Sequence, residues 1–277
     1  MHPEVFRTDF FGLLSQPLIL HAYGLAIAVG FMSAMLLAKR QANREGEDGD
    51  IVVDMAFWLL LWGLVGARVI FILTQMDRYL ADPTQILYFW RGGLVFYGGF
   101  IGAAICLIYY TRRHKLPFFK FADLFVPFLA MAHAFGRLGC LCAGCCFGKP
   151  TEMPWGIVFP IGSMPHQAHQ EAGHVLMEQL PLAVHPTQLY EAGAELLVFF
   201  FLLSLRPKKR FHGQILLVWL SVYPVIRSVI ELYRGDKIRG VYFMGLSTSQ
   251  YISIAVACSA ALIYFYLRKK GDKIESL

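Results

Sequence analysis

Charged side chains are scarce in this sequence. Asp, Glu, Lys and Arg make up 16% of its 277 residues, whereas an average soluble domain contains about 25%. So few charges cannot cover the surface of a soluble domain of this length, and a hydrophobic fraction of 57% excludes intrinsic disorder. The mean hydropathy is +0.52. The composition therefore predicts an integral membrane protein.

Apolar residues gather into segments of about the length that a helix needs to cross a bilayer, roughly 20 residues. There are seven such segments: 17–38, 51–73, 94–111, 121–139, 187–205, 213–233 and 248–267. The third and fourth are shorter and contain more Gly or Pro. The predicted fold is all-α, a single membrane domain over 1–277 with seven transmembrane helices.

Basic residues alternate between the connections. Fifteen of the 25 Lys and Arg follow spans one, three, five and seven, in or near KRQANR, RRHK, RPKKR and RKKGDK. Lys149 is the only cation in 140–186. Because cytoplasmic connections carry the excess of Lys and Arg, we expect a cytoplasmic C-terminus and an N-terminus outside. The segment 140–186 then forms a small extracytoplasmic head between spans four and five. This topology explains the net charge of +6 without a nucleic-acid partner.

Several spans carry polar or charged residues at their outer ends, where the cost of burying a charge in a bilayer suggests function. These residues are Arg68, Arg137, Arg227, Arg234, Glu191, Glu195, Glu231, His21, Tyr23 and Tyr97. One interpretation is a set of neutralised ion pairs that fixes helix packing. The other is an anion site, since four planar guanidinium groups at one depth suit a phosphate. A phosphate inside a bilayer belongs to a phospholipid head group.

Three pairs of polar residues within the spans are four positions apart, so each pair shares one helix face. The pairs are His133 and Arg137, Glu191 and Glu195, and Arg227 and Glu231. A histidine inside a span is often a packing group bonded to a carbonyl. One turn from an arginine, it is also a candidate acid or base.

Four of the six cysteines form the pattern C-x-C-x-x-C-C at Cys140, Cys142, Cys145 and Cys146. The pattern is compatible with zinc, because four histidines follow, with a disulfide, or with a redox-active C-x-x-C. There is no second C-x-x-C, and these cysteines lie on a Gly-rich exit from a helix. We therefore expect a structural role or an uncharged pocket wall, with no metal ligand and no cofactor.

A glycine-rich stretch, RGGLVFYGGFIG over 91–102, leads into the third span. Its small residues, including Gly98 and Gly99, allow close packing of helices or leave backbone accessible to a ligand. The composition favours neither interpretation.

Several motifs in a fixed order resemble the bacterial prolipoprotein diacylglyceryl transferase family, from about residue 17 to 267. The motifs are HAYG (21–24), GARV (66–69), GGLVFYGGFIG (92–102), GRLG (136–139), HPTQLYE (185–191), YPVIRSVIELYR (223–234) and GLSTSQYIS (245–253). The resemblance implies a seven-span enzyme of the bacterial inner membrane. Such an enzyme transfers diacylglyceryl from phosphatidylglycerol to the lipobox cysteine thiol of a prolipoprotein, and glycerol phosphate leaves.

The resemblance also implies functional residues. The matching positions are Tyr23, Arg137, Gly148, Glu191, Tyr223, Arg227, Glu231 and Arg234. Substrate-binding residues are also expected in the matching motifs, at Arg68, Gly98, Gly99, His21 and His185. Arginines would hold the phosphate and stabilise charge on the leaving group.

Two positions depart from the family pattern. Tyr97 follows Phe96 where the family usually has His, and Cys140 replaces an Asn after GRLG. Tyrosine, with a pKa of about 10, is a poorer base at neutral pH than histidine. A thiol with a pKa of about 8.5 is already partly ionised, and nearby arginines lower that pKa further. If a base is used, we expect His133, with the Tyr97 hydroxyl orienting the ester or phosphate.

Three other functions stay open on the sequence alone. They are a related head-group transferase with another acceptor, a membrane thiol–disulfide oxidoreductase that uses the Cys140–Cys146 cluster, and a lipid-binding or transport protein without chemistry. A transferase depends on the arginines and an oxidoreductase on the cysteines, so substitutions at the two sets distinguish these functions.

Overall fold

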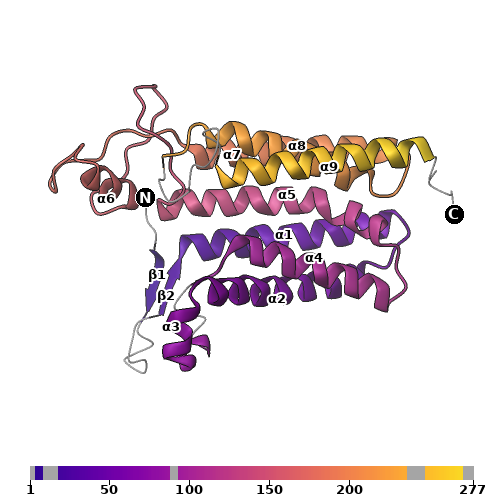
Figure 1. The fold of residues 1–277 in the computed structure, drawn as a ribbon. Helices are drawn as coiled ribbons and strands as arrows, with labels where there is room; N and C mark the ends of the chain where they lie inside the picture. Colours follow the sequence, from indigo (N-terminus) through magenta and orange to yellow (C-terminus); the bar gives the residue numbers. More distant parts are fainter. Residues whose placement is uncertain (1–3, 9–17, 88–92, 236–246, 271–277) are drawn as a thin grey trace. The chain divides into compact units, whose positions relative to one another are not determined.

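The computed structural model describes residues 4–8, 18–87, 93–235 and 247–270, which are mostly helical (Figure 1). The long helices are α1 (Ala22–Arg44), α2 (Gly49–Thr74), α4 (Phe96–Arg113), α5 (Phe118–Ala143), α7 (Thr187–Leu205), α8 (Gln214–Glu231) and α9 (Thr248–Lys270). The short ones are α3 (Met76–Ala81), α6 (Met164–Glu171) and the 3-10 helices η2 (Pro83–Leu87) and η4 (Arg206–Lys208).

Six of the described helical segments are long and apolar enough to cross a membrane. They are α1, α2, α5, α8, the larger part of α9 and the segment Thr187–Lys208, which contains α7. The prediction of a helical multi-span membrane protein is therefore confirmed. Helix α4 is not among the six; its 18 residues include three glycines and end in Arg112 and Arg113.

The prediction was wrong about the start of the first span. We expected a helix from residue 17, but Leu18–His21 forms strand β2, which pairs antiparallel with β1 (Glu4–Thr8), and α1 begins only at Ala22. The apolar run continues through strand and helix alike, so composition does not mark where one becomes the other. Residue 17 itself lies outside the described residues.

The chain divides into two compact units, and the first is Met35–Leu124. There α2 and α4 pack backbone to backbone: a methyl group on Gly98 would collide with the carbonyl oxygen of Gly66, and one on Gly66 with that of Gly98. The glycine-rich stretch thus has a packing role in the part of it that the structure describes, since only glycine permits this approach. Residues 91 and 92 lie outside that part.

The second unit combines Met1–Ala34 with Phe125–Leu277. Helix α8 packs against both α7 and α9, and the rings of Phe128 on α5 and Phe199 on α7 are 6.1 Å apart. The segment 144–186 gathers at the end of this bundle where α5 ends and α7 begins (Figure 1). Because α5 continues to Ala143, Cys140 belongs to the helix, not to the connecting segment that we expected to begin there.

Candidate active site

A chain of buried polar side chains joins α5 to α7. His133 Nδ1 lies 2.8 Å from Glu195 Oε1, and His133 Nε2 accepts a hydrogen bond of 3.2 Å from Arg137 Nε. Arg137 Nη2 lies 2.8 Å from Glu191 Oε1. The i, i+4 spacing places His133 and Arg137 on one face of α5 and Glu191 and Glu195 on one face of α7, as predicted. The contacts fit the tautomer of His133 whose Nδ1–H donates to Glu195.

Helix α8 adds a second arginine to this network. Arg227 Nε lies 3.9 Å from Glu191 Oε1, and Arg227 Nη2 lies 2.5 Å from Glu231 Oε2. Two guanidinium groups therefore share the Glu191 carboxylate, which is only 1% exposed. Arg227 Nη1 is buried without a hydrogen-bond partner in the described part of the chain. A guanidinium donor left over among apolar helices is what a further anion requires.

These ion pairs also stabilise the packing of the three helices. Removing one partner of a buried pair costs about 3–5 kcal/mol, because it leaves the other charge uncompensated. Both interpretations of the intramembrane charges, helix packing and anion binding, are therefore compatible with one arrangement of side chains.

Aromatic residues border the network. The Tyr223 ring centroid lies 5.5 Å from that of His133, and Tyr223 stacks on Trp219 at 5.3 Å. Tyr23, at the start of α1, packs on α5 at Gly139, where an added Cβ would lie 3.1 Å from Tyr23 Cδ2. The structure thus brings together polar residues that the sequence singles out on α1, α5, α7 and α8.

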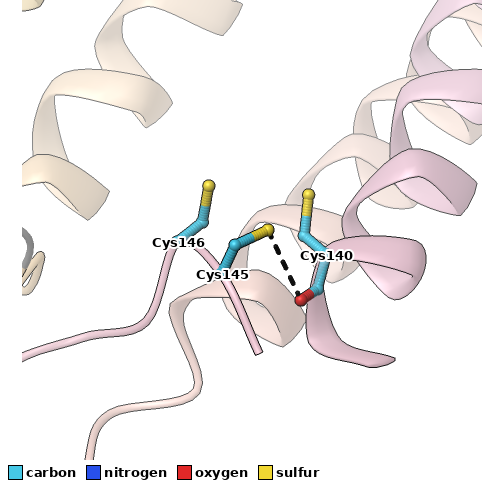
Figure 2. Close-up of side chains that lie close together, drawn as sticks. All are labelled: Cys140, Cys145 and Cys146. Atoms are coloured by element: carbon cyan, nitrogen blue, oxygen red, sulfur yellow. Dashed lines mark hydrogen bonds between the residues drawn. The ribbon is translucent and has the colours of Figure 1, made fainter. Parts of the chain in front are cut away.

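Three cysteines converge where α5 ends. Cys140 lies in the last turn of the helix, Cys145 and Cys146 follow it, and their Sγ atoms all lie within 4.8 Å of one another (Figure 2). Cys145 Sγ also donates to the Cys140 carbonyl oxygen at 3.7 Å. The remaining cysteine of the motif, Cys142, is not in this group, because a side chain two positions along a helix points to a different face.

The first turn of α7 holds the cysteine loop in place. Thr187 Oγ1 donates to the Cys146 carbonyl oxygen and Gln188 Nε2 to that of Cys145, each at 2.7 Å. Both side chains are almost fully buried. Cys146 adopts φ 60°, a left-handed conformation that costs a non-glycine residue on the order of 1–3 kcal/mol and persists only where the surroundings impose it. The sequence did not point to Thr187 or Gln188 as residues that hold the loop, although both lie inside the HPTQLYE motif.

The thiols of the loop are electrostatically unequal. The pKa of Cys146 is lowered by hydrogen bonds with Cys140 and Cys145 and by the charges of Arg234 and Arg137, which together outweigh its burial. The pKa of Cys145 is raised by hydrogen bonds with Cys140 and Cys146 and by burial. Negative charge in the cluster therefore concentrates on Cys146.

The segment after the cysteines is tied to the end of α8. Gly148 forms an antiparallel bridge with Arg234, and Gly148 N donates to the His185 carbonyl oxygen at 3.0 Å. An added Cβ on Gly148 would lie 2.5 Å from that oxygen, so the close approach requires glycine. His185 Nδ1 lies 3.2 Å from the Tyr190 hydroxyl. These contacts fix the backbone of Arg234 beside the cysteine loop.

Comparison with known proteins identifies the family. Residues 11–266 match the family model of prolipoprotein diacylglyceryl transferase. The chain belongs to that family. Similar proteins named phosphatidylglycerol–prolipoprotein diacylglyceryl transferase include one from Clostridium tetani, 34% identical over 92% of this chain and 93% of the relative. Another, from Bordetella bronchiseptica, is 33% identical over 98% of this chain and 99% of the relative, and one from Vibrio cholerae is 32% identical over 92% and 90%.

Some predicted site residues of this diacylglyceryl transferase family member lie in the unit Met35–Leu124 and are described within it. Arg68 donates from Nη2 to the Gln85 carbonyl oxygen at 2.9 Å and from Nη1 to that of Gly93 at 3.3 Å. Its guanidinium also lies over the rings of Phe71 and Tyr79. Arg68 therefore holds the connection between α2 and α4.

The other predicted residues outside the network differ in exposure. Tyr97 is 49% exposed in the first turn of α4, and His21 is exposed at the end of β2. Gly98 and Gly99 face the backbone of α2, where a Cβ on Gly99 would lie 3.3 Å from the Gly63 carbonyl oxygen. The structure supplies a packing reason for both glycines.

Proposed function

We propose that this chain is a phosphatidylglycerol–prolipoprotein diacylglyceryl transferase. It moves the diacylglyceryl group of phosphatidylglycerol to the lipobox cysteine thiol of a prolipoprotein, and glycerol phosphate leaves. One observation carries the proposal: Arg137 and Arg227 share a buried glutamate among apolar helices, in a chain that matches this family over residues 11–266.

The two arginines bind the phosphate of the lipid in this proposal. Planar guanidinium groups donate two parallel hydrogen bonds to a phosphate, which a lysine cannot do. As the bond between the glycerol carbon and the phosphate oxygen breaks, negative charge develops on the leaving group and Arg137 and Arg227 stabilise it. Glu191 and Glu231 support this by holding the two guanidinium groups in place.

His133 is the proposed proton acceptor for the lipobox thiol. Its contact with Glu195 orients the ring, and its Nε2 lone pair faces Arg137. When Arg137 turns toward the bound phosphate, this lone pair becomes available for the proton. Tyr97 is proposed to orient the ester or phosphate through its hydroxyl.

The remaining predicted residues are proposed to shape the substrate site. Tyr23 and Tyr223 present hydroxyl groups beside the arginines, and Arg234 adds positive charge near the cysteine loop, as its effect on the pKa of Cys146 indicates. The substrate-binding residues proposed in addition are Arg68, Gly98, Gly99, Gly148, His21 and His185.

The topology is also a proposal. Helix α4 completes seven spans of a single membrane domain, with the N-terminus outside and the C-terminus in the cytoplasm of a bacterial inner membrane. The segment 144–186, which follows the end of α5, forms the extracytoplasmic head. The alternation of basic connections supports this orientation. Reporter fusions at Lys208 should report a cytoplasmic position, and an outside position would contradict the topology.

A transfer assay tests the proposed function. Purified protein is mixed with phosphatidylglycerol and a lipobox peptide, and the peptide mass is measured. We expect a diacylglyceryl thioether that fails to form when the peptide cysteine is replaced by serine or when phosphatidylethanolamine is the only lipid. Transfer to a different acceptor alone would favour a related head-group transferase. Thiol–disulfide exchange without transfer would favour the oxidoreductase.

A further inference from the structure

The thiols of Cys140, Cys145 and Cys146 have no part in the transfer chemistry as described, in which the attacking sulfur belongs to the substrate. The sequence alone led us to expect no metal ligand here, but the convergence of three sulfur atoms changes that interpretation. We propose that these three thiols bind a thiophilic divalent cation such as Zn²⁺, and that the fourth coordination position of the metal binds the lipobox thiolate. The metal site rests on the three thiols alone, whereas its role toward the lipobox cysteine rests on the proposed function.

The positions of the sulfur atoms suit such a cation. The three Sγ atoms already lie within 4.8 Å of one another, and Figure 2 shows Cys145 Sγ between those of Cys140 and Cys146. A Zn–S bond of about 2.3 Å places the sulfurs of a tetrahedral site roughly 3.8 Å apart. Side-chain rotations that move each sulfur by about 1 Å or less therefore complete the triangle.

The backbone around the thiols is fixed in advance. Buried Thr187 and Gln188 clamp the carbonyl groups of the two loop cysteines, and the left-handed backbone of Cys146 is imposed by these surroundings. A metal site needs ligands whose positions are set by such supporting contacts. A purely packing role for a half-buried cysteine explains neither the clamp nor the left-handed conformation.

The surrounding charge favours the loaded site. Arg137 and Arg234 act on the cluster electrostatically and would repel a bare cation. A divalent cation bound by three thiolates, however, carries a net charge of −1, because a coordinating thiol is deprotonated. The two arginines then neutralise a metal–thiolate anion instead of opposing a cation.

Three protein ligands leave one position of a tetrahedral metal open, which is the arrangement of catalytic zinc sites. The lipobox thiol binds there as a thiolate, and its proton passes to His133 and then to water. An electron pair of this sulfur forms the bond to the glycerol carbon, and the carbon–oxygen bond pair departs with glycerol phosphate. The neutral thioether is a weak ligand and leaves the metal, with no change of oxidation state.

The metal also explains how the chain works with Tyr97 where the family usually has histidine. Coordination lowers the pKa of the incoming thiol, so a strong base is not required. This chain thus has both departures from the family pattern, Tyr97 in the glycine-rich segment and a cysteine cluster after GRLG.

Binding is tested with Cd²⁺ on the full chain in detergent, reduced and then freed of reductant. We expect one ion per chain and a sulfur-to-cadmium charge-transfer absorption in the ultraviolet. Cys146→Ser should lose at least tenfold in affinity, and the matched control Cys142→Ser should bind like the wild type. In the wild type alone, Cd²⁺ should protect Cys140, Cys145 and Cys146 from alkylation but leave Cys142 reactive, so the test does not depend on a variant that folds.

The role in transfer is tested by removing and restoring the metal. We expect the rate of diacylglyceryl transfer from phosphatidylglycerol to the lipobox peptide to fall at least tenfold after a chelator removes the metal. The rate should return when Zn²⁺ is added. With Co²⁺ bound, a cysteine peptide should shift the visible spectrum, and its serine counterpart should not.

Three results would overturn the inference. They are sub-stoichiometric Cd²⁺ binding, equal alkylation of all four cysteines with and without Cd²⁺, and a disulfide within the trio in protein isolated without reductant. Full transfer by metal-free protein would overturn the role of the metal while leaving the proposed function intact. Stoichiometric metal without any transfer would instead contradict the proposed function and leave the metal site standing.

Discussion

Replacing Arg137 by lysine should reduce transfer strongly while keeping the positive charge. The guanidinium contacts His133 through Nε and Glu191 through Nη2, and the proposal adds a phosphate at the remaining donors. The single nitrogen of a lysine cannot satisfy all three partners. Losing two charge-assisted hydrogen bonds at about 1.5–3 kcal/mol each removes about 3 kcal/mol or more of transition-state stabilisation. Since about 1.4 kcal/mol corresponds to a tenfold change, kcat/KM should fall about 100-fold or more.

The assay measures the initial rate at which the peptide thioether forms, once at saturating and once at limiting phosphatidylglycerol. Arg227→Lys should behave like Arg137→Lys, because Arg227 shares Glu191 and also binds Glu231. Arg210→Lys is the matched control, since Arg210 is exposed and no role is proposed for its side chain. Rates for Arg137→Lys within about threefold of the control would refute the assignment of this arginine to the phosphate.

Further predictions concern proton transfer, packing and thiol reactivity. His133→Gln should lose the acidic limb of the pH profile of kcat/KM. A variant with the same acidic limb and the same kcat/KM as the wild type would show that His133 is not the proton acceptor. Gly148→Ala should destabilise the protein by about 1–3 kcal/mol in thermal unfolding, because its new Cβ meets a backbone oxygen at 2.5 Å. Gly136→Ala is the control, because the Cβ that it adds would have no heavy atom within 4 Å beyond its own helix backbone and chain neighbours. In metal-free protein, the lowered pKa of Cys146 and the raised pKa of Cys145 make Cys146 the more ionised thiol. Because the thiolate is the reactive form, Cys146 should be alkylated at lower pH than Cys145; the reverse order would contradict the electrostatics.

Helical periodicity predicted which residues of one helix share a face, and the structure confirms this for the pairs on α5 and α7. The partners across helices were beyond the sequence. That His133 contacts Glu195 while Arg137 contacts Glu191 depends on how α5 and α7 are rotated about their axes, and hydrophobic periodicity fixes that rotation only coarsely.

The cysteine motif illustrates a second limit. The spacing alone does not tell which of the four cysteines lie close together. Three of them converge because α5 ends at Ala143 and the chain then turns back toward Cys140. Thr187 and Gln188 were missed because a side chain that donates to a distant carbonyl leaves no periodic signal in the sequence. The strand Leu18–His21 was missed for a related reason, since its apolar residues continue directly into those of α1.

The reaction that we propose for this chain is transfer of diacylglyceryl from phosphatidylglycerol to a thiol. Its most direct test is the ratio of two products, measured with phosphatidylglycerol labelled in its phosphate: glycerol phosphate released and peptide thioether formed. We expect one glycerol phosphate for each thioether, with both products falling together in Arg137→Lys. Thioether formation without glycerol phosphate, or glycerol phosphate release that continues without a cysteine peptide, would contradict it.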